Sequence, residues 1–397
     1  MQNPRNPFTY RTGIGSSSSL PNDYQIGKTI IDPITGDTYV LKKEIGSSCN
    51  GFCRVYRALY SKRLEENGIL VQSDSVTLKT INKNFPECEE LQLQVHTSIS
   101  NTPHSSLIGL NRAFTTNELV CVSLPYMSEG SLRYILSTRP NKKLTQDFIA
   151  VVLKEALVGI QDLHAESNPR AHKTLNAGDI FISIHDVNGE MLIKLAFEAS
   201  RYHSEIINTE KKPNLEEASS SSSFLDPKII SEWAAAPEVF GSENGTSTGP
   251  KSDIWLLGIT ALELAYGVLP VRNREDLECI IKKIREKKKL PKSLEKLLIH
   301  KEGKFKKVLD LVKPKKKVFS EEFEKMVLAC LCENPENRPT ADQLLDTPFF
   351  TTAIERLKKF VLDAFQGVIF KISVDPFITI VFAPLNPNQG SLNLTSA

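Results

Sequence analysis

The fold is decided by the stretch Arg170-Ala-His-Lys-Thr-Leu-Asn-Ala-Gly-Asp-Ile-Phe-Ile182. It follows a helix-like run that ends at Leu163-His164 and leads into a short apolar run, Ile180 to Ile184, which is typical of a strand. On its own the stretch is compatible with an ordinary strand–turn–strand unit. The flanking sequence must therefore show whether this stretch has a catalytic or binding role.

The stretch resembles the catalytic loop of protein kinases, whose pattern is H-R-D, four residues, then N. In that alignment His172 and Lys173 match the His and the Arg, and Thr174 stands in the place of the catalytic Asp. Asp179 matches the metal-binding Asn, and Asn176 the Lys that steadies the γ-phosphate. A threonine hydroxyl cannot take the proton of a substrate hydroxyl as that Asp does. The resemblance thus implies a loop without its base.

The composition is that of a soluble globular protein: 397 residues, 40% hydrophobic and 24% charged, with a net charge of +2. A charge this close to zero implies no general attraction to nucleic acid or membrane. The seven cysteines are scattered and odd in number, which favours free thiols in a reducing compartment over disulfides or a metal site. No apolar signal segment or membrane span is present. We expect a cytoplasmic protein, with the nucleus as the alternative.

A glycine-containing turn is expected near the start of the folded region. Tyr39 to Ile45 alternates like a strand and runs into Gly46-Ser-Ser-Cys-Asn-Gly51, and a second strand resumes at Val55. Kinases have a glycine-rich loop here, in which backbone amides approach the nucleotide phosphates. Gly46 and Gly51 are the two glycines that match it. A plain β-hairpin is the alternative.

The next strand carries a lysine at the position where kinases contact the phosphates. Ser75 to Ile81 resembles the strand with the V-A-I-K motif, which makes Lys79 that lysine. The helix predicted from Glu87 to Ser98 places Gln94 where the family has the glutamate that pairs with the lysine, with Glu90 as the rival position. If Gln94 holds that position, Lys79 lacks its ionic partner.

The resemblance also implies an adenine-binding hinge. Leu119 to Leu124 reads as a buried strand, and Leu124 would be its gatekeeper residue. Pro125, Tyr126 and Met127 would then face an adenine. A helix predicted from Phe148 to Leu163 leads back to the catalytic loop.

A second acid is missing after the catalytic loop. Met191 to Ser200 resembles the strand and turn that carry D-F-G, with Phe197, Glu198 and Ala199 at the three positions. A phenyl ring in place of the Asp removes a magnesium ligand and is expected to crowd the phosphate site. Glu198 is expected to point elsewhere. These substitutions predict weak ATP binding that does not require magnesium.

The closest matches to the family pattern lie in structural motifs of the second half of the chain. Ala236-Pro-Glu238 corresponds to A-P-E, and Lys251 to Gly267, with Asp253, to the central buried helix of the large lobe. Asn334 to Pro339 resembles the N-P-x-x-R-P turn, whose arginine is Arg338. We expect an ion pair between Glu238 and Arg338 that fixes one arrangement of the lobe.

These features predict an α+β, bilobal protein-kinase-like fold with a small β-rich lobe and a larger helical lobe. The predicted parts are a disordered segment, 1–38; the small lobe, 39–124; the hinge and large lobe, 125–350, with a lysine-rich insert at 280–318; and a C-terminal helix and hydrophobic tail, 351–397. The insert is interpreted as a solvated segment with helical pieces rather than a nucleic-acid site. The tail either packs on the large lobe or meets a partner.

Within the kinases, Ile259 to Gly267 followed by Pro270 resembles the Sterile-20 group, and the two lost acids resemble the STRAD pseudokinases. That family binds ATP without efficient transfer and, with an armadillo-like scaffold protein, holds a true protein kinase in its active conformation. This chain differs in retaining Lys79 and in lacking the family's C-terminal Trp-Glu-Phe. The resemblance implies a pseudokinase that activates or scaffolds a partner kinase. The alternatives are a weak Sterile-20 kinase in which Asp179 recruits the metal, and an adaptor with a closed pocket.

Overall fold

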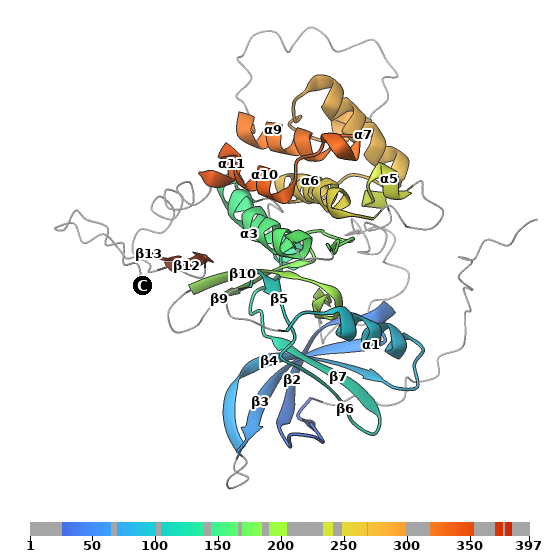
Figure 1. Ribbon diagram of the computed structural model, residues 1–397, viewed down its shortest axis with the longest axis vertical. Coiled ribbons are helices and arrows are strands. Elements are labelled where there is room, and N and C mark those ends of the chain that lie inside the picture. The colour runs from blue at the N-terminus through green and yellow to red at the C-terminus, as the bar shows by residue number, and fades with distance from the viewer. Residues whose placement is uncertain are drawn as a thin grey trace, which may run out of the picture.

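An antiparallel sheet forms the small lobe at the bottom of Figure 1. The computed structural model describes residues 26–64, 70–100, 105–138, 144–165, 169–184, 190–204, 233–240, 248–267, 269–298, 318–352, 370–375 and 378–382. The sheet has the order β1-β2-β3-β4-β7-β6. Its strands are β1 (Thr29–Ile31), β2 (Thr38–Ser48), β3 (Cys53–Arg63), β4 (Leu70–Asn82), β6 (Arg112–Thr115) and β7 (Leu119–Pro125). Helix α1 (Glu87–Thr97) packs beside the sheet and buries Cys88 and Leu91.

The small lobe begins earlier in the chain than predicted. Residues 26–38 belong to the predicted disordered segment, yet β1 pairs antiparallel with the first residues of β2. Ile30 is buried in the lobe core, and the backbone N–H of Asp32 bonds to the carbonyl of Asp37 across the connecting turn, 2.9 Å apart. Gly36 supplies the positive φ, +74°, that this turn requires. A three-residue strand is too short to show a periodic pattern, which explains the error. Residues 1–25 lie outside the described residues.

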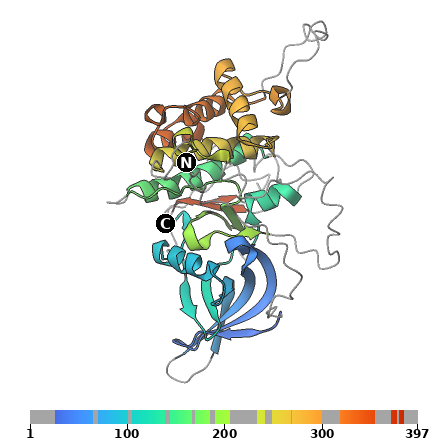
Figure 2. The same cartoon turned by 90° about the vertical axis from the view of Figure 1, so that its right-hand side faces the viewer.

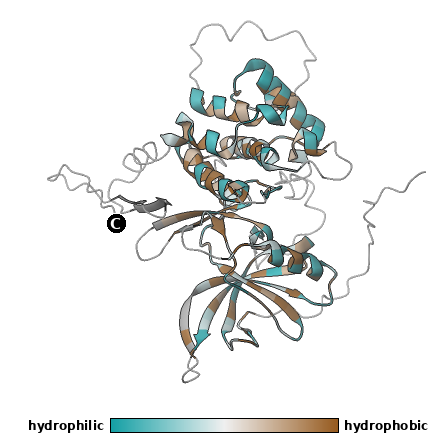
Figure 3. Ribbon diagram, viewed as in Figure 1, coloured by the Kyte–Doolittle hydropathy of each residue, from teal (hydrophilic) through white to brown (hydrophobic). Residues whose placement is uncertain are grey.

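The large lobe is helical and is built around two buried helices, α3 (Gln146–Ala165) and α6 (Pro250–Tyr266). Every residue of α6 from Ser252 to Ala265 is buried, as expected for a helix that is apolar on all sides. Figure 3 shows these two helices as largely hydrophobic segments within the lobe. The shorter helices around them are α2 (Leu132–Thr138), α5 (Pro237–Phe240), α7 (Arg274–Lys287), α8 (Glu295–Leu298), α9 (Glu321–Cys330), α10 (Ala341–Leu345) and α11 (Pro348–Thr351).

The lysine-rich region 280–318 contains helices, as expected, but its described part packs on the lobe and is not a solvated insert throughout. Its first part belongs to α7, which starts before it, at Arg274, and buries Ile280, Ile281 and Ile284 against the lobe. Leu290, Leu294 and Leu297 continue this packing up to α8. The lysines of α7 lie at exposed or half-buried positions, so this helix is amphipathic. Residues 299–317 lie outside the described residues.

A second sheet lies where the lobes meet and has the order β13-β12-β10-β9-β8. It is made of β8 (Gly130–Ser131), β9 (Ile180–Ile184), β10 (Glu190–Ala196), β12 (Phe370–Asp375) and β13 (Ile378–Phe382), with β5 (Leu107–Ile108) beside β10. Met191 of β10 pairs parallel with Ile372 of β12, and β12 pairs with β13, so these two strands of the C-terminal tail extend a sheet of the large lobe. Figures 1 and 2 both show β12 and β13 beside β9 and β10. The predicted C-terminal helix lies outside the described residues, which leave out 353–369.

The observed architecture confirms the predicted α+β bilobal class. The predicted boundaries of β9 are those found, and those of α1, α3, α6 and β7 differ by one to two residues. No described helix is long and apolar enough to cross a membrane.

Candidate functional site

The catalytic-loop stretch is held by Asp253 of α6, whose carboxylate is fully buried. It accepts hydrogen bonds from the backbone N–H groups of His172, at 2.7 Å, and Lys173, at 2.8 Å. Its Oδ2 also lies 2.9 Å from Nε2 of His164 at the end of α3. A carboxylate that satisfies buried backbone donors fixes the loop between α3 and β9. Asp253, a predicted structural residue, therefore contacts the loop itself.

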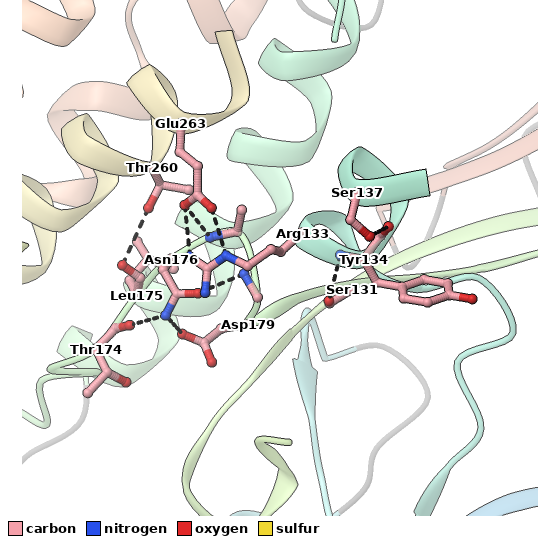
Figure 4. A network of polar contacts seen from close by, with 12 residues as sticks. Ser131, Arg133, Tyr134, Ser137, Thr174, Leu175, Asn176, Asp179, Thr260 and Glu263 are labelled. Atoms are coloured by element: carbon pink, nitrogen blue, oxygen red, sulfur yellow. Dashed lines mark hydrogen bonds and ion pairs between the residues drawn. The ribbon is translucent and has the colours of Figure 1, made fainter. Parts of the chain in front are cut away.

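Both the hydroxyl and the backbone carbonyl of Thr174, at the position of the catalytic base, accept hydrogen bonds. Its hydroxyl accepts a hydrogen bond from the guanidinium of Arg201, and its carbonyl accepts one from Asn176 Nδ2 at 2.8 Å. The same Nδ2 donates to Oδ2 of Asp179, also at 2.8 Å (Figure 4). A hydroxyl in this position has no useful basicity at neutral pH. Thr174 itself therefore cannot accept the proton of a substrate hydroxyl.

Asp179 is a buried carboxylate at the place of the metal-binding Asn. Burial raises the pKa of Asp179 above its usual range, and electrostatic interactions with His172, Arg201 and Arg133 oppose the rise. In Figure 4 its carboxylate lies beside Asn176, at the end of the loop. The residue is thus brought to the cleft, as the alignment predicts.

A buried ion pair that the sequence did not reveal supports this loop from the other side. Glu263 of α6 accepts hydrogen bonds from Arg133 Nε, at 2.8 Å, and Arg133 Nη2, at 3.1 Å. It also accepts one from the backbone N–H of Ala177, at 3.2 Å, so the pair joins α2, α6 and the catalytic loop (Figure 4). The two residues are 130 positions apart in the chain. No local pattern marks such a pair.

Lys79, the predicted phosphate-contacting residue, is completely buried. Its ammonium donates to the backbone carbonyls of Ala199 and Arg201, both at 2.8 Å. Burial lowers the pKa of Lys79, because removal from water disfavours the charged form. Glu90 instead accepts a hydrogen bond from Gln94 Nε2 at 3.0 Å. Among the described residues no ion pair joins Lys79 to a carboxylate, so the clamp of an active kinase is not formed.

Phe197 and Glu198, the two residues after β10, do not point in the directions that were predicted for them. Phe197 packs into the large-lobe core, with its ring 5.8 Å from that of His172 and 5.2 Å from the guanidinium carbon of Arg170. It does not crowd the phosphate site. Glu198 has a positive φ of +50°, and it lines the cleft although it was expected to point elsewhere. The reason is the tight turn Phe197–Ser200, in which the Phe197 N–H bonds to Ser200 Oγ at 2.7 Å.

The predicted glycine loop is mostly strand. Gly46 lies within β2 and pairs both with Val55 of β3 and with Ser204 of β11 (His203–Ser204). Only the turn Cys49–Gly51 separates β2 from β3, and Gly51 there has a φ of +88°. The described backbone therefore corresponds to the hairpin alternative, and not to a loop open over phosphates.

The predicted hinge residues follow one another from the end of β7, but they contact different parts of the protein. Leu124 is buried in a small-lobe cluster with Ile81 and Val122, and Pro125 ends β7. The Tyr126 ring lies 5.1 Å from the guanidinium carbon of Arg57. Met127 is buried together with Val55, Phe181 and Tyr202 in a cluster that spans the two lobes.

What remains of the cleft is a cavity of about 260 Å³. It is lined by Ser48, Cys49, Asn50, Glu90, Gln94, Thr174, Asn176, Asp179, Glu198, Arg201, Tyr202 and His203. Neither Lys79 nor any predicted hinge residue lines it. In the part of the chain that the structure describes, no cluster of three His, Cys, Asp or Glu side chains could hold a metal ion. In this arrangement Met127 and Lys79, both predicted to contact an adenine nucleotide, contact the chain itself: Met127 lies in the cluster that contains Tyr202, and Lys79 bonds to Ala199 and Arg201.

The ion pair expected between Glu238 and Arg338 is formed. Arg338 Nη1 and Nη2 donate to the two carboxylate oxygens at 2.6 and 2.8 Å, and the arginine side chain is fully buried. Arg338 also donates to the carbonyls of Lys251, Cys332 and Glu333. This network joins the start of α6 to the turn after α9.

Comparison with known proteins agrees with this architecture. The sequence model of the protein kinase domain matches residues 66–350. The chain is 24% identical over 327 residues to serine/threonine-protein kinase sid1 of Schizosaccharomyces pombe and 27% identical over 325 residues to serine/threonine-protein kinase fray2 of Dictyostelium discoideum. Each match covers 81% of this chain but only 55% and 26%, respectively, of the relative.

One relative is described as an adapter. Human STE20-related kinase adapter protein beta is 25% identical over 362 residues, which cover 85% of this chain and 80% of that protein. The similarities therefore extend both to proteins named as kinases and to one named as a kinase adapter.

Proposed function

The chain belongs to the protein kinase domain family, and we propose that it is a pseudokinase that activates or scaffolds a partner protein kinase. One observation carries the proposal. Lys79, which would bind nucleotide phosphates, is buried and hydrogen-bonded to two carbonyls of its own chain. A kinase needs this lysine for the phosphates and for its glutamate partner.

The rest of the cleft supports the absence of phosphoryl transfer. Thr174 offers a hydroxyl, already bonded to Arg201, where a general base is required. Phe197 is packed in the core, and a ring cannot ligate a cation. Transfer depends on a base that orients the substrate hydroxyl and on cations that neutralise the phosphate charge, and Thr174 and Phe197 supply neither.

The structural motifs favour a binding role. The Glu238–Arg338 network and the Asp253 contacts keep the large lobe in one arrangement without any catalytic requirement. Resemblance to the STRAD pattern and similarity to a protein named as a kinase adapter make a kinase the partner class. An armadillo-like scaffold would be a further partner. An adaptor of this kind activates its partner by binding the active conformation better than the inactive one.

The proposed interface is the face around residues 201–240, where a kinase receives its substrate. Residues 205–232 of this face, including the serine run 219–223, lie outside the described residues. Glu238 and Arg338 lie at its base. The competing location is the C-terminal strand pair β12–β13.

The test uses purified kinases from the cells that contain this protein. Each is assayed for substrate phosphorylation with the full chain, with a chain in which 205–232 is a neutral linker, and with a chain truncated after Phe350. We expect the full chain to stimulate at least one kinase and the linker variant to lose that stimulation. Stimulation by the linker variant but not by the truncation would move the interface to the tail. Failure of the full chain to stimulate any kinase would contradict the adaptor role.

A further inference from the structure

A tyrosine fills the space where the hinge would face a base. Tyr202 is buried in the cluster formed by Val55 of β3, Met127 of the hinge and Phe181 of β9. Its ring centre lies 4.8 Å from that of Phe181. Burial raises the pKa of the Tyr202 hydroxyl, and the Thr77 side chain of β4 partly offsets the rise. One flat aromatic ring therefore contacts residues of both lobes, as a stacked base would.

Two backbone carbonyls close to Tyr202 in the chain accept hydrogen bonds from the Lys79 ammonium. Ala199 and Arg201 flank Ser200, and Arg201 directly precedes Tyr202. Their carbonyl oxygens accept both hydrogen bonds of Lys79 at 2.8 Å. Partial negative charge on these oxygens compensates a buried ammonium, as phosphate oxygens would. Arg201 is fixed further by its side chain, which donates to the Thr174 hydroxyl.

The residues after Tyr202 pair with the end of β2, just before the turn Cys49–Gly51. His203 and Ser204 form β11, which pairs antiparallel with Ser47 and Gly46 of β2. The approach is so close that a Cβ on Gly46 would lie 2.0 Å from the His203 carbonyl oxygen and 3.2 Å from Tyr202 Cδ2. Because Gly46 has no side chain, the backbone of β11 can approach it closely, as a nucleotide phosphate approaches the glycines of a kinase.

We propose that residues 199–204 are an internal ligand of the nucleotide cleft. Tyr202 takes the place of the base, and the carbonyls of Ala199 and Arg201 take the place of phosphate oxygens. Strand β11 pairs with β2 at Gly46. The cleft is then closed without nucleotide, and the contacts between the lobes come from the chain itself. An adenine nucleotide must first displace this segment, so its apparent affinity falls by the fraction of molecules in which the cleft is open.

The direct test is ADP titration calorimetry on the full chain, with and without magnesium, for wild type, Tyr202→Ala and Tyr202→Phe. Wild type and Tyr202→Phe, which keeps the ring, are expected to show no or very weak binding. Tyr202→Ala is expected to bind ADP roughly tenfold or more tightly than wild type, since the competing ring is gone. Equal affinity of all three proteins for ADP would overturn the proposal.

A second measurement does not depend on the folding of Tyr202→Ala. Hydrogen exchange of the wild type should show protected amides in the peptide that covers 199–204, and addition of ADP should leave them unchanged. Gly46→Ala should remove this protection, because the new methyl group collides with β11. Gly249→Ala is the matched control, since a Cβ there meets nothing within 4 Å. Unprotected amides in the wild type would contradict the proposal.

These readouts involve neither a partner kinase nor phosphate transfer. Failure of the internal-ligand proposal would remove the Lys79 contacts as support for the adaptor role, but the kinase-stimulation assay would still decide that role separately. Conversely, a chain with a sealed cleft that stimulates no kinase would refute the adaptor role alone.

Discussion

At the scale of single residues, the substitutions in the cleft make it part of a packed interior. Thr174 gives Arg201 an uncharged oxygen to bond, which ties the catalytic loop to residues 199–204. Phe197 packs against His172 and Arg170, where a carboxylate would have required water or a cation. Lys79 keeps its charge compensated by carbonyls. Each residue stabilises the closed cleft without any bound ligand.

Asp179 is expected to make stability fall with rising pH. Burial raises its pKa in the folded chain above the ordinary value of 3.8, so the folded state binds more protons than the unfolded state between those two values. Stability therefore decreases as the pH rises through this window. Asp179→Asn keeps an oxygen for the Asn176 hydrogen bond and removes the charge. The variant should be more stable than wild type at neutral pH, and the difference should vanish towards pH 3.8.

Urea unfolding at a series of pH values checks this expectation. Asp346→Asn, at an exposed position of the same residue type, is the control. Parallel stability curves for wild type and Asp179→Asn would show that the Asp179 carboxylate does not experience the burial that the structure gives it.

At the scale of elements, the sequence predicted the segments whose own pattern is strong. Helices α3 and α6 and strands β7 and β9 have continuous or periodic apolar residues, and their positions were predicted closely. The strands β1 and β11 were not predicted, because two or three residues carry no period. The pairing of β11 with β2 and the ion pair of Arg133 with Glu263 join distant parts of the chain. Only the tertiary fold determines them, so Tyr202 could not be assigned to the cleft from the sequence.

The link between α5 and the turn after α9 should be among the most sensitive contacts in the large lobe. Glu238→Ala leaves the fully buried Arg338 guanidinium without its carboxylate, and we expect a loss of about 3–5 kcal/mol in the free energy of unfolding. Asp276→Ala breaks the exposed ion pair with Arg272 and should cost about 1 kcal/mol or less.

Chemical denaturation of both variants measures the difference. The double variant Glu238→Ala/Arg338→Met should recover part of the loss, since the unpaired charge is removed as well. Equal, small effects of Glu238→Ala and Asp276→Ala would mean that the buried pair contributes no more than a surface pair.

At the scale of the whole molecule, the two lobes are joined by the segment that follows β10. Lys79 and β2 of the small lobe contact residues 199–204, while Arg201 reaches the catalytic loop of the large lobe. The fold thus keeps the shape of a kinase while its own chain fills the place of the nucleotide. A fixed shape is what an adaptor needs, because it acts through its preference for one partner conformation.

The most direct test of the central claim is a single-turnover assay with γ-labelled ATP, magnesium and protein substrates, comparing the full chain with Lys79→Met. The melting temperature of the variant is measured first to establish that it is folded. We expect wild type to transfer no more phosphate than Lys79→Met, since Thr174 cannot serve as a base and Lys79 is already bonded to Ala199 and Arg201. Transfer by the wild type that Lys79→Met abolishes would contradict the account and establish a weak kinase.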